Sequence, residues 1–103
     1  MDAESITKFK RAGEIARESR DHGISLIQEG VIVREVLDKI EEKISGMGGE
    51  PAFPAQISIN RVAAHYCPTM EDETKFQKGD VCKVDIGVHI DGHIADNSRT
   101  VCV

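Results

Sequence analysis

The chain reads VCKVDIGVHI at residues 81–90, Asp-Gly at 91–92 and HIADNSRTVCV at 93–103. Both runs are rich in β-branched residues, which favour strands. An Asp-Gly pair between two such runs is a strong hairpin signal, because a type I′ turn needs positive φ at both central residues. We therefore predict an antiparallel β-hairpin with Asp91 and Gly92 at its tip.

This hairpin would have one apolar and one acidic face. With a two-residue turn, Asp85 lies opposite Ser98, and Asp96 lies on the same side of the pleat. Diagonal positions of this kind are about 7–8 Å apart, so the two carboxylates can converge on one point. The other face of the first strand is an apolar stripe that helices must cover, made of Cys82, Val84, Ile86, Val88 and Ile90.

Two interpretations of the aspartate pair stay open from spacing alone. Like charges aimed at one point repel unless water, a proton or a cation separates them, and carboxylate oxygens suit a divalent metal. Gly87 lies between the two on the same face and would leave room for an ion or a substrate backbone. The alternative is that Asp85 and Asp96 only solvate the open face of the sheet.

Two amphipathic helices are expected before the hairpin. Residues 5–29 carry an apolar stripe among mixed charges, with Ser5 or Asp2 as the N-cap, Gly23 as a weak point and Gly30 as the end. A second stripe repeats at helical spacing and stops at the glycines of residues 46–49; it consists of Val33, Val36, Leu37, Ile40 and Ile44.

The middle of the chain changes character. Residues 50–54 contain two prolines and cannot lie inside a helix. Residues 55–60 alternate apolar and polar side chains and predict a short strand, whereas residues 71–80 read as a charged loop. The fold class is therefore α+β. Because the chain stops inside a strand pattern at Val103, we expect a truncated part of a larger protein.

The composition excludes several classes of protein. Thirteen Lys and Arg against 18 Asp and Glu give 103 residues a charge of −5, with only 4% aromatics, so no basic surface for nucleic acid or an anionic membrane is expected. We also expect no membrane span and no secretory signal. The three cysteines form no CxxC pair, and their odd number suits a reducing compartment, so we expect a cytoplasmic protein.

Other residue types with catalytic potential carry no function by themselves. His89 and His93 have metal-pair spacing but would point to opposite faces of the hairpin. His65 reads as a half-buried loop histidine and Phe53 as a packing residue between prolines. By default the cysteines would be buried structural thiols; they are Cys67, Cys82 and Cys102.

Five segments together, in order and spacing, resemble the type II methionine aminopeptidases. They are PAFP at 51–54, SIN at 58–60, AAHYCP at 63–68, KGD at 78–80 and VDIGVHIDGHIAD at 84–96. The lack of a long charged N-terminal extension resembles the short archaeal form. The resemblance spans essentially all 103 residues. It implies that residues 1–103 are the N-terminal half of a pita-bread catalytic domain, with helices outside a curved antiparallel sheet.

The resemblance also implies roles for particular residues. Asp85 would bind one divalent metal ion and Asp96 would bridge two, with Co, Mn, Fe or Zn as the candidates. His65 would be the catalytic imidazole that hydrogen-bonds the scissile amide, Phe53 would line the pocket for the methionine side chain, and both would be substrate-binding residues. Asn60 belongs to a motif but has no chemical step. The other three metal ligands, a His and two Glu, would come from the rest of the fold.

The implied function of the complete enzyme is metal-dependent hydrolysis that removes the N-terminal methionine from nascent proteins. Its partners would be N-terminal methionine peptides, with the ribosome as a further candidate. We expect the 103 residues alone to be inactive, and the sheet edge at residues 100–103 to self-associate or to pair with the missing half.

Two rival classes stay open. One is a noncatalytic pita-bread relative, which would be expected to lose the residues kept here. The other is an Xaa-Pro dipeptidase, against which the Phe-Pro and Ala-Ala-His-Tyr segments argue. Two positions depart from the family: Cys67 stands where Thr is usual, and Gly23 replaces a better helix former.

Overall fold

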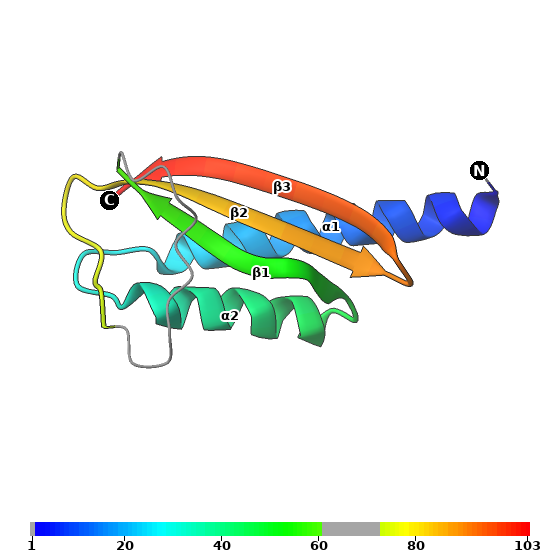
Figure 1. Cartoon of the computed structure of the whole chain (residues 1–103), viewed down its shortest axis with the longest axis horizontal. Helices are drawn as coiled ribbons and strands as arrows, with labels where there is room; N and C mark the ends of the chain where they lie inside the picture. Colours follow the sequence, from blue (N-terminus) through cyan, green and yellow to red (C-terminus); the bar gives the residue numbers. More distant parts are fainter. Residues whose placement is uncertain (1, 61–72) are drawn as a thin grey trace.

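A computed structural model describes residues 2–60 and 73–103 of the chain. Two helices lie on one face of a three-stranded antiparallel sheet with strand order β1-β2-β3 (Figure 1). This confirms the predicted fold class. The elements are α1 (Ala3–Leu26), α2 (Val33–Gly46), β1 (Glu50–Ile59), β2 (Val81–Ile90) and β3 (His93–Cys102).

Helix α1 begins at a side-chain cap and meets α2 near its C-terminal end. Of the two predicted caps, Asp2 is the one observed: its Oδ1 accepts a hydrogen bond from the Ser5 backbone N–H at 2.7 Å. Gly23 is more than a weak helix former, because a Cβ there would lie 2.4 Å from Cγ1 of Ile40 in α2. The absent side chain therefore permits the close approach of the two helices. Across the described ranges, no helix is long and apolar enough to cross a membrane.

The core lies between the helices and the sheet. All five residues of the predicted α2 stripe are buried, and α1 adds Ala12, Ile15 and Ala16. From β2 the predicted apolar face contributes four side chains with 0% exposure, while Ile90 at the strand end is only partly buried. The fully buried four are Cys82, Val84, Ile86 and Val88.

Strand β1 is longer than predicted and contains both prolines. It begins at Glu50, not near residue 55, and its pairing with β2 is interrupted between Pro51 and Phe53 and again between Phe53 and Gln56. Proline is tolerated in edge strands and at bulges because it lacks a backbone donor. Because β1 is an edge strand with two pairing irregularities, it can contain both prolines, which the sequence analysis had placed outside the predicted strand.

The end of the predicted charged loop belongs to the core. Residues 74–76 run beside the connection between α1 and α2, where Val33 N–H donates to Thr74 O at 2.8 Å and Phe76 N–H donates to Val31 O at 2.9 Å. The Phe76 side chain is 1% exposed. Residues 73–80 form a loop, as predicted, but the burial of Phe76 was not foreseen, because a single aromatic residue leaves no periodic pattern.

Candidate metal centre

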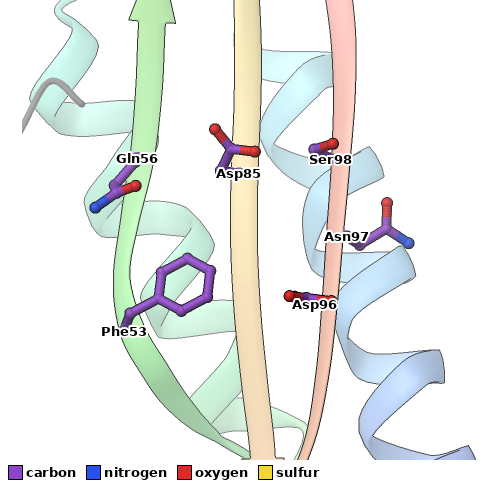
Figure 2. Close-up of a pocket in the computed structure, with 6 residues that line it drawn as sticks. All are labelled: Phe53, Gln56, Asp85, Asp96, Asn97 and Ser98. Carbon is purple, nitrogen blue, oxygen red and sulfur yellow. The ribbon is translucent and has the colours of Figure 1, made fainter. Parts of the chain in front are cut away.

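The β2–β3 hairpin has the predicted register. Asp91 (φ 49°) and Gly92 (φ 82°) both have positive φ, as the predicted turn requires. Asp85 pairs with Ser98, and Gly87 pairs with Asp96. Both carboxylates therefore lie on the face of the sheet opposite the helices, as Figure 2 shows.

A cavity of about 500 Å³ lies over this face. Two rows of residues across the strands form it: Gln56, Asp85 and Ser98 in one row, and Phe53, Gly87 and Asp96 in the next. The described lining side chains are Phe53, Gln56, Asp85, Asp96, Asn97 and Ser98 (Figure 2). The structure thus brings together the two predicted metal ligands and the predicted pocket residue Phe53.

The surroundings of Asp85 suit a cation. Its side chain is 17% exposed, and Lys83 Nζ lies 3.8 Å from Oδ1. Its other oxygen, Oδ2, is buried and has no hydrogen-bond partner in the described structure. A buried carboxylate oxygen without a partner is costly, and a bound cation would remove that cost. Asp96, by contrast, is solvent-exposed.

The described residues supply only part of a metal site. No group of three or more His, Cys, Asp or Glu side chains that could hold an ion exists within residues 2–60 and 73–103. Asp85 and Asp96 nevertheless fit the role of two oxygen ligands, because hard divalent cations prefer carboxylates and two-metal sites bring such groups together. They would hold the ions on the side facing the cavity.

The space above Gly87 differs from the prediction. A Cβ at Gly87 would lie 2.2 Å from Cε1 and 2.6 Å from Cδ1 of Phe53, so the aromatic ring rests on this glycine. The expected room for an ion or a substrate backbone at Gly87 is therefore filled by Phe53. Figure 2 shows the ring turned from β1 toward β2.

The histidines do not form a shared site in the described structure. His89 Nε2 lies 3.3 Å from Glu50 Oε2 on β1, whereas His93 contacts α1, with Nε2 3.2 Å from Ser5 Oγ and its ring against Phe9. The prediction that His89 and His93 point to opposite faces is confirmed. His65, the predicted catalytic imidazole, and Cys67 lie outside the described residues.

Two cavity residues, Gln56 and Asn97, were not predicted from the sequence. Gln56 pairs with Asp85 across β1 and β2. Asn97 Oδ1 accepts a hydrogen bond from Arg20 Nη1 of α1 at 2.6 Å, which ties the residue after Asp96 to the helix behind the sheet. Neither residue gives a signal in the sequence, because the first depends on a bulge and the second on a contact between distant segments.

The motif residues Asn60 and Asp80 have a structural role at the junction of β1 and β2. Asn60 Nδ2 donates to Asp80 Oδ1 at 3.1 Å, and Asn60 Oδ1 accepts from the Val81 N–H at 2.9 Å. Asp80 Oδ2 accepts from the Gln77 N–H at 2.8 Å. These bonds join the end of β1 to the start of β2, so they fix the strands that carry the site.

The described structure is a helix-backed antiparallel sheet with two carboxylates lining one cavity. The sequence signature of metallopeptidase family M24 matches residues 7–103, so the chain belongs to this family. Similar curated relatives are archaeal methionine aminopeptidases. That of Pyrococcus horikoshii is 48% identical over 98 residues (95% of this chain, 33% of the relative), and that of Methanocaldococcus jannaschii 46% over 101 residues (98% and 34%). The chain thus spans about a third of their length.

Solved structures confirm the architecture. A thermophilic Arx1 superposes with a TM-score of 0.90 at 19% identity, covering 100% of this chain and 31% of that chain, a likeness of fold alone. The prolidase from Pyrococcus horikoshii has a TM-score of 0.84 at 29% identity, covering 99% of this chain and 29% of that chain. The two helices and the three-stranded sheet correspond to part of the pita-bread fold, as predicted.

Proposed function

We propose that this chain forms the N-terminal part of the catalytic domain of a methionine aminopeptidase. The complete enzyme would remove the N-terminal methionine from nascent proteins in the cytoplasm with the help of two divalent cations. The observation that carries the proposal is the meeting of Asp85, Asp96 and Phe53 in one cavity on the open face of the sheet. Acidic ligands and an apolar ring side by side suit hydrolysis next to an apolar side chain.

In this proposal Asp85 and Asp96 hold the ions. Divalent cations in such a site supply Lewis-acid activation of the scissile carbonyl and of a water molecule. Asp85, with one buried oxygen free of hydrogen bonds among the described residues, would hold an ion together with the exposed Asp96. The strands beneath them are fixed by pairing on both sides of β2, so the ligands are held rigidly.

The substrate contacts are proposed for Phe53 and His65. The Phe53 ring offers an apolar surface beside the carboxylates, which suits the unbranched methionine side chain. His65 is proposed as the imidazole that hydrogen-bonds the scissile amide; its support is the AAHYCP motif alone. The N-terminal amine of the substrate would lie nearest the acidic pair.

The curated relatives favour this function over the two rivals. Relatives that carry the name methionine aminopeptidase are 46–48% identical across nearly the whole chain, whereas the Pyrococcus horikoshii prolidase is 29% identical. Asp85 and Asp96 are both present and lie on the same face of the sheet, which supports the catalytic function over a noncatalytic relative. Methionine removal is therefore the better-supported activity.

A chimera tests the proposal. This chain, joined to the remaining two thirds of the Pyrococcus horikoshii methionine aminopeptidase, should cleave Met-Ala-Ser in Mn(II) or Co(II) and leave an X-Pro dipeptide intact. Asp96→Ala should abolish the activity, and Gly13→Ala, on the far side of the sheet, should not. The 103-residue chain alone should show no turnover.

Two results would contradict the proposal. One is a folded chimera, with a cooperative melting transition, that cleaves the X-Pro dipeptide but not Met-Ala-Ser. The other is turnover by the 103-residue chain alone that disappears in Asp96→Ala, which would show that the remaining two thirds are dispensable.

A further inference from the structure

We infer that Gly87 is a specificity-determining residue of the candidate site, because its missing side chain lets the Phe53 ring lie on β2 beside the acidic pair. This inference rests on the proposed function and adds a residue to it. Gly87 would set the depth of the space available to the first side chain of the substrate.

The contact between the ring and the glycine is too close for any other residue. A Cβ built on Gly87 would lie 2.2, 2.6 and 2.8 Å from three atoms of the Phe53 ring. Real Cβ atoms essentially never approach other heavy atoms to within 3.0 Å. Alanine at this position therefore requires the ring to move by about an ångström, the difference between these distances and ordinary van der Waals contact.

The irregular pairing of β1 is what directs Phe53 onto Gly87. In a regular strand Phe53 and Gln56 would face opposite sides, since they are three residues apart. One extra residue of β1 between them lets Phe53 pair with Gly87 and Gln56 with Asp85, so both side chains reach the cavity. Phe53, Gly87 and Asp96 then form one row across the three strands.

The clash cannot be relieved by moving β2 toward the core. Behind β2, the neighbouring side chains Ile86 and Val88 are buried at 0% exposure, so the strand cannot retreat into the core. Strands β1 and β3 hold β2 on both sides. We expect the ring to rise into the cavity that it shares with Asp85 and Asp96, which would shorten the space for an apolar substrate side chain.

The test compares substrates of different side-chain length in the chimera described above. Gly87→Ala should lower kcat/KM for Met-Ala-Ser relative to 2-aminobutyryl-Ala-Ser by about tenfold or more, the range expected for lost space in an apolar pocket. Mn(II) affinity, measured by calorimetry, should stay unchanged, because neither carboxylate is altered. Gly13→Ala is the matched control, since a Cβ there meets nothing within 4 Å.

A compensating substitution separates loss of space from misfolding. Phe53→Leu introduced into Gly87→Ala should restore part of the preference for methionine, because the smaller side chain leaves room for the new methyl group. Proton NMR of the 103-residue chain should show contacts between the Phe53 ring and the Gly87 α-protons, and these should disappear in Gly87→Ala.

The outcomes distinguish the two proposals. An active chimera in which Gly87→Ala keeps the wild-type ratio between the two substrates overturns the role of Gly87 and leaves the proposed function standing. A folded wild-type chimera without methionine-releasing activity overturns the proposed function, and the specificity role with it. A lowered ratio together with weakened Mn(II) binding also contradicts the inference, because the effect would then come from the metal ligands.

Discussion

Under the proposed function, a metal ion bound at Asp85 would couple metal binding to the stability of the fold. Its Oδ2 is buried without a hydrogen-bond partner among the described residues, and the Lys83 ammonium 3.8 Å from Oδ1 compensates its charge only partly. A buried carboxylate oxygen that lacks a partner in the metal-free protein destabilises the fold, and a bound metal ion would remove that cost. Metal binding and folding stability would therefore depend on each other.

Metal should therefore stabilise the chimera through Asp85. In wild type, Mn(II) at a hundredfold excess over its Kd should add about 2.7 kcal/mol to the free energy of unfolding, seen as a rise in Tm. Asp85→Asn should remove most of this rise, and in EDTA the variant should melt no lower than wild type. Glu42→Gln, an exposed carboxylate of α2, is the control; an undiminished Mn(II) response in Asp85→Asn would reject the ligand role.

The burial of one cysteine differs from the prediction. Cys82 is buried as expected, but Cys102 is exposed, because alternate residues of β3 face away from the core. Burial, with a smaller effect from the Asp80 carboxylate, raises the pKa of the Cys82 thiol to about 11. Iodoacetamide at pH 8 should consequently alkylate Cys102 and spare Cys82, as mass mapping of the labelled peptides can verify.

The raised pKa of Cys82 also predicts a pH dependence. An unfolded thiol ionises near pH ~8.5, whereas folded Cys82 keeps its proton to about 11. The contribution of the protonated Cys82 thiol to stability is complete below the pKa of the unfolded thiol and is lost as the pH rises from that value toward the folded pKa. The free energy of unfolding from urea titrations should fall between pH 8.5 and 10.5, and Cys82→Val should flatten the decline.

The relative positions of Asp85 and Asp96 could be predicted from the sequence, but the presence of Gln56 and Asn97 in the cavity could not. A two-residue turn fixes the whole register of the hairpin, so the position of Asp85 relative to Asp96 follows from local sequence. Gln56 reaches the cavity only through an extra residue in β1, and Asn97 is fixed by Arg20 at a separation of 77 residues. No pattern in the neighbouring sequence predicts either of these two placements.

At the scale of elements, two glycines of α1 should respond oppositely to the same substitution. Gly13→Ala should stabilise the chain by about 0.5–1 kcal/mol, because a Cβ there meets nothing and alanine favours helix. Gly23→Ala should destabilise it by about 1–3 kcal/mol, since the new methyl group overlaps Ile40 of α2. Urea denaturation of both variants measures the difference, and equal effects would contradict the close helix contact.

The junction of β1 and β2 should depend on Asn60 and Asp80. Asp80→Ala leaves the Gln77 N–H and the Asn60 amide without their acceptor and should cost about 1–3 kcal/mol. Asn60 has φ 57°, so Asn60→Ala should lose its hydrogen bonds and also strain the backbone. Asn60→Gly avoids the strain and should be less destabilising by about 1 kcal/mol. Thermal melting of the two variants decides whether the backbone or the amide matters.

Helices were easier to predict than β1. The α2 stripe repeats at helical spacing over its full length, and every member is buried. Strand β1 carries two prolines and two pairing irregularities, so its alternation appears only in its second half. Phe76 enters the core through long-range pairing with residues 30–33, which no local pattern reveals.

At the scale of the whole molecule, the outer edge of β3 is open. Among the described strands β3 pairs only with β2, and exposed side chains, including Ile94 at 55%, follow its cavity face. An open edge is a template for another strand. We expect the 103-residue chain alone to self-associate at high concentration in sedimentation experiments, and Thr100→Lys to weaken the association. A monomer at all concentrations would contradict this prediction.

Helix α1 packs mainly on β2 and β3, and Lys8 near its start pairs with Asp91 at the tip of the hairpin at 2.9 Å. Synthesis proceeds from the N-terminus, so the apolar stripe of α1 exists before the strands that cover it. Only after α2 and β1 have been added does the hairpin arrive to bury that stripe. Docking of the hairpin on α1 therefore joins segments that lie far apart in the sequence, and such non-local contacts make folding slow relative to a helical bundle of equal length.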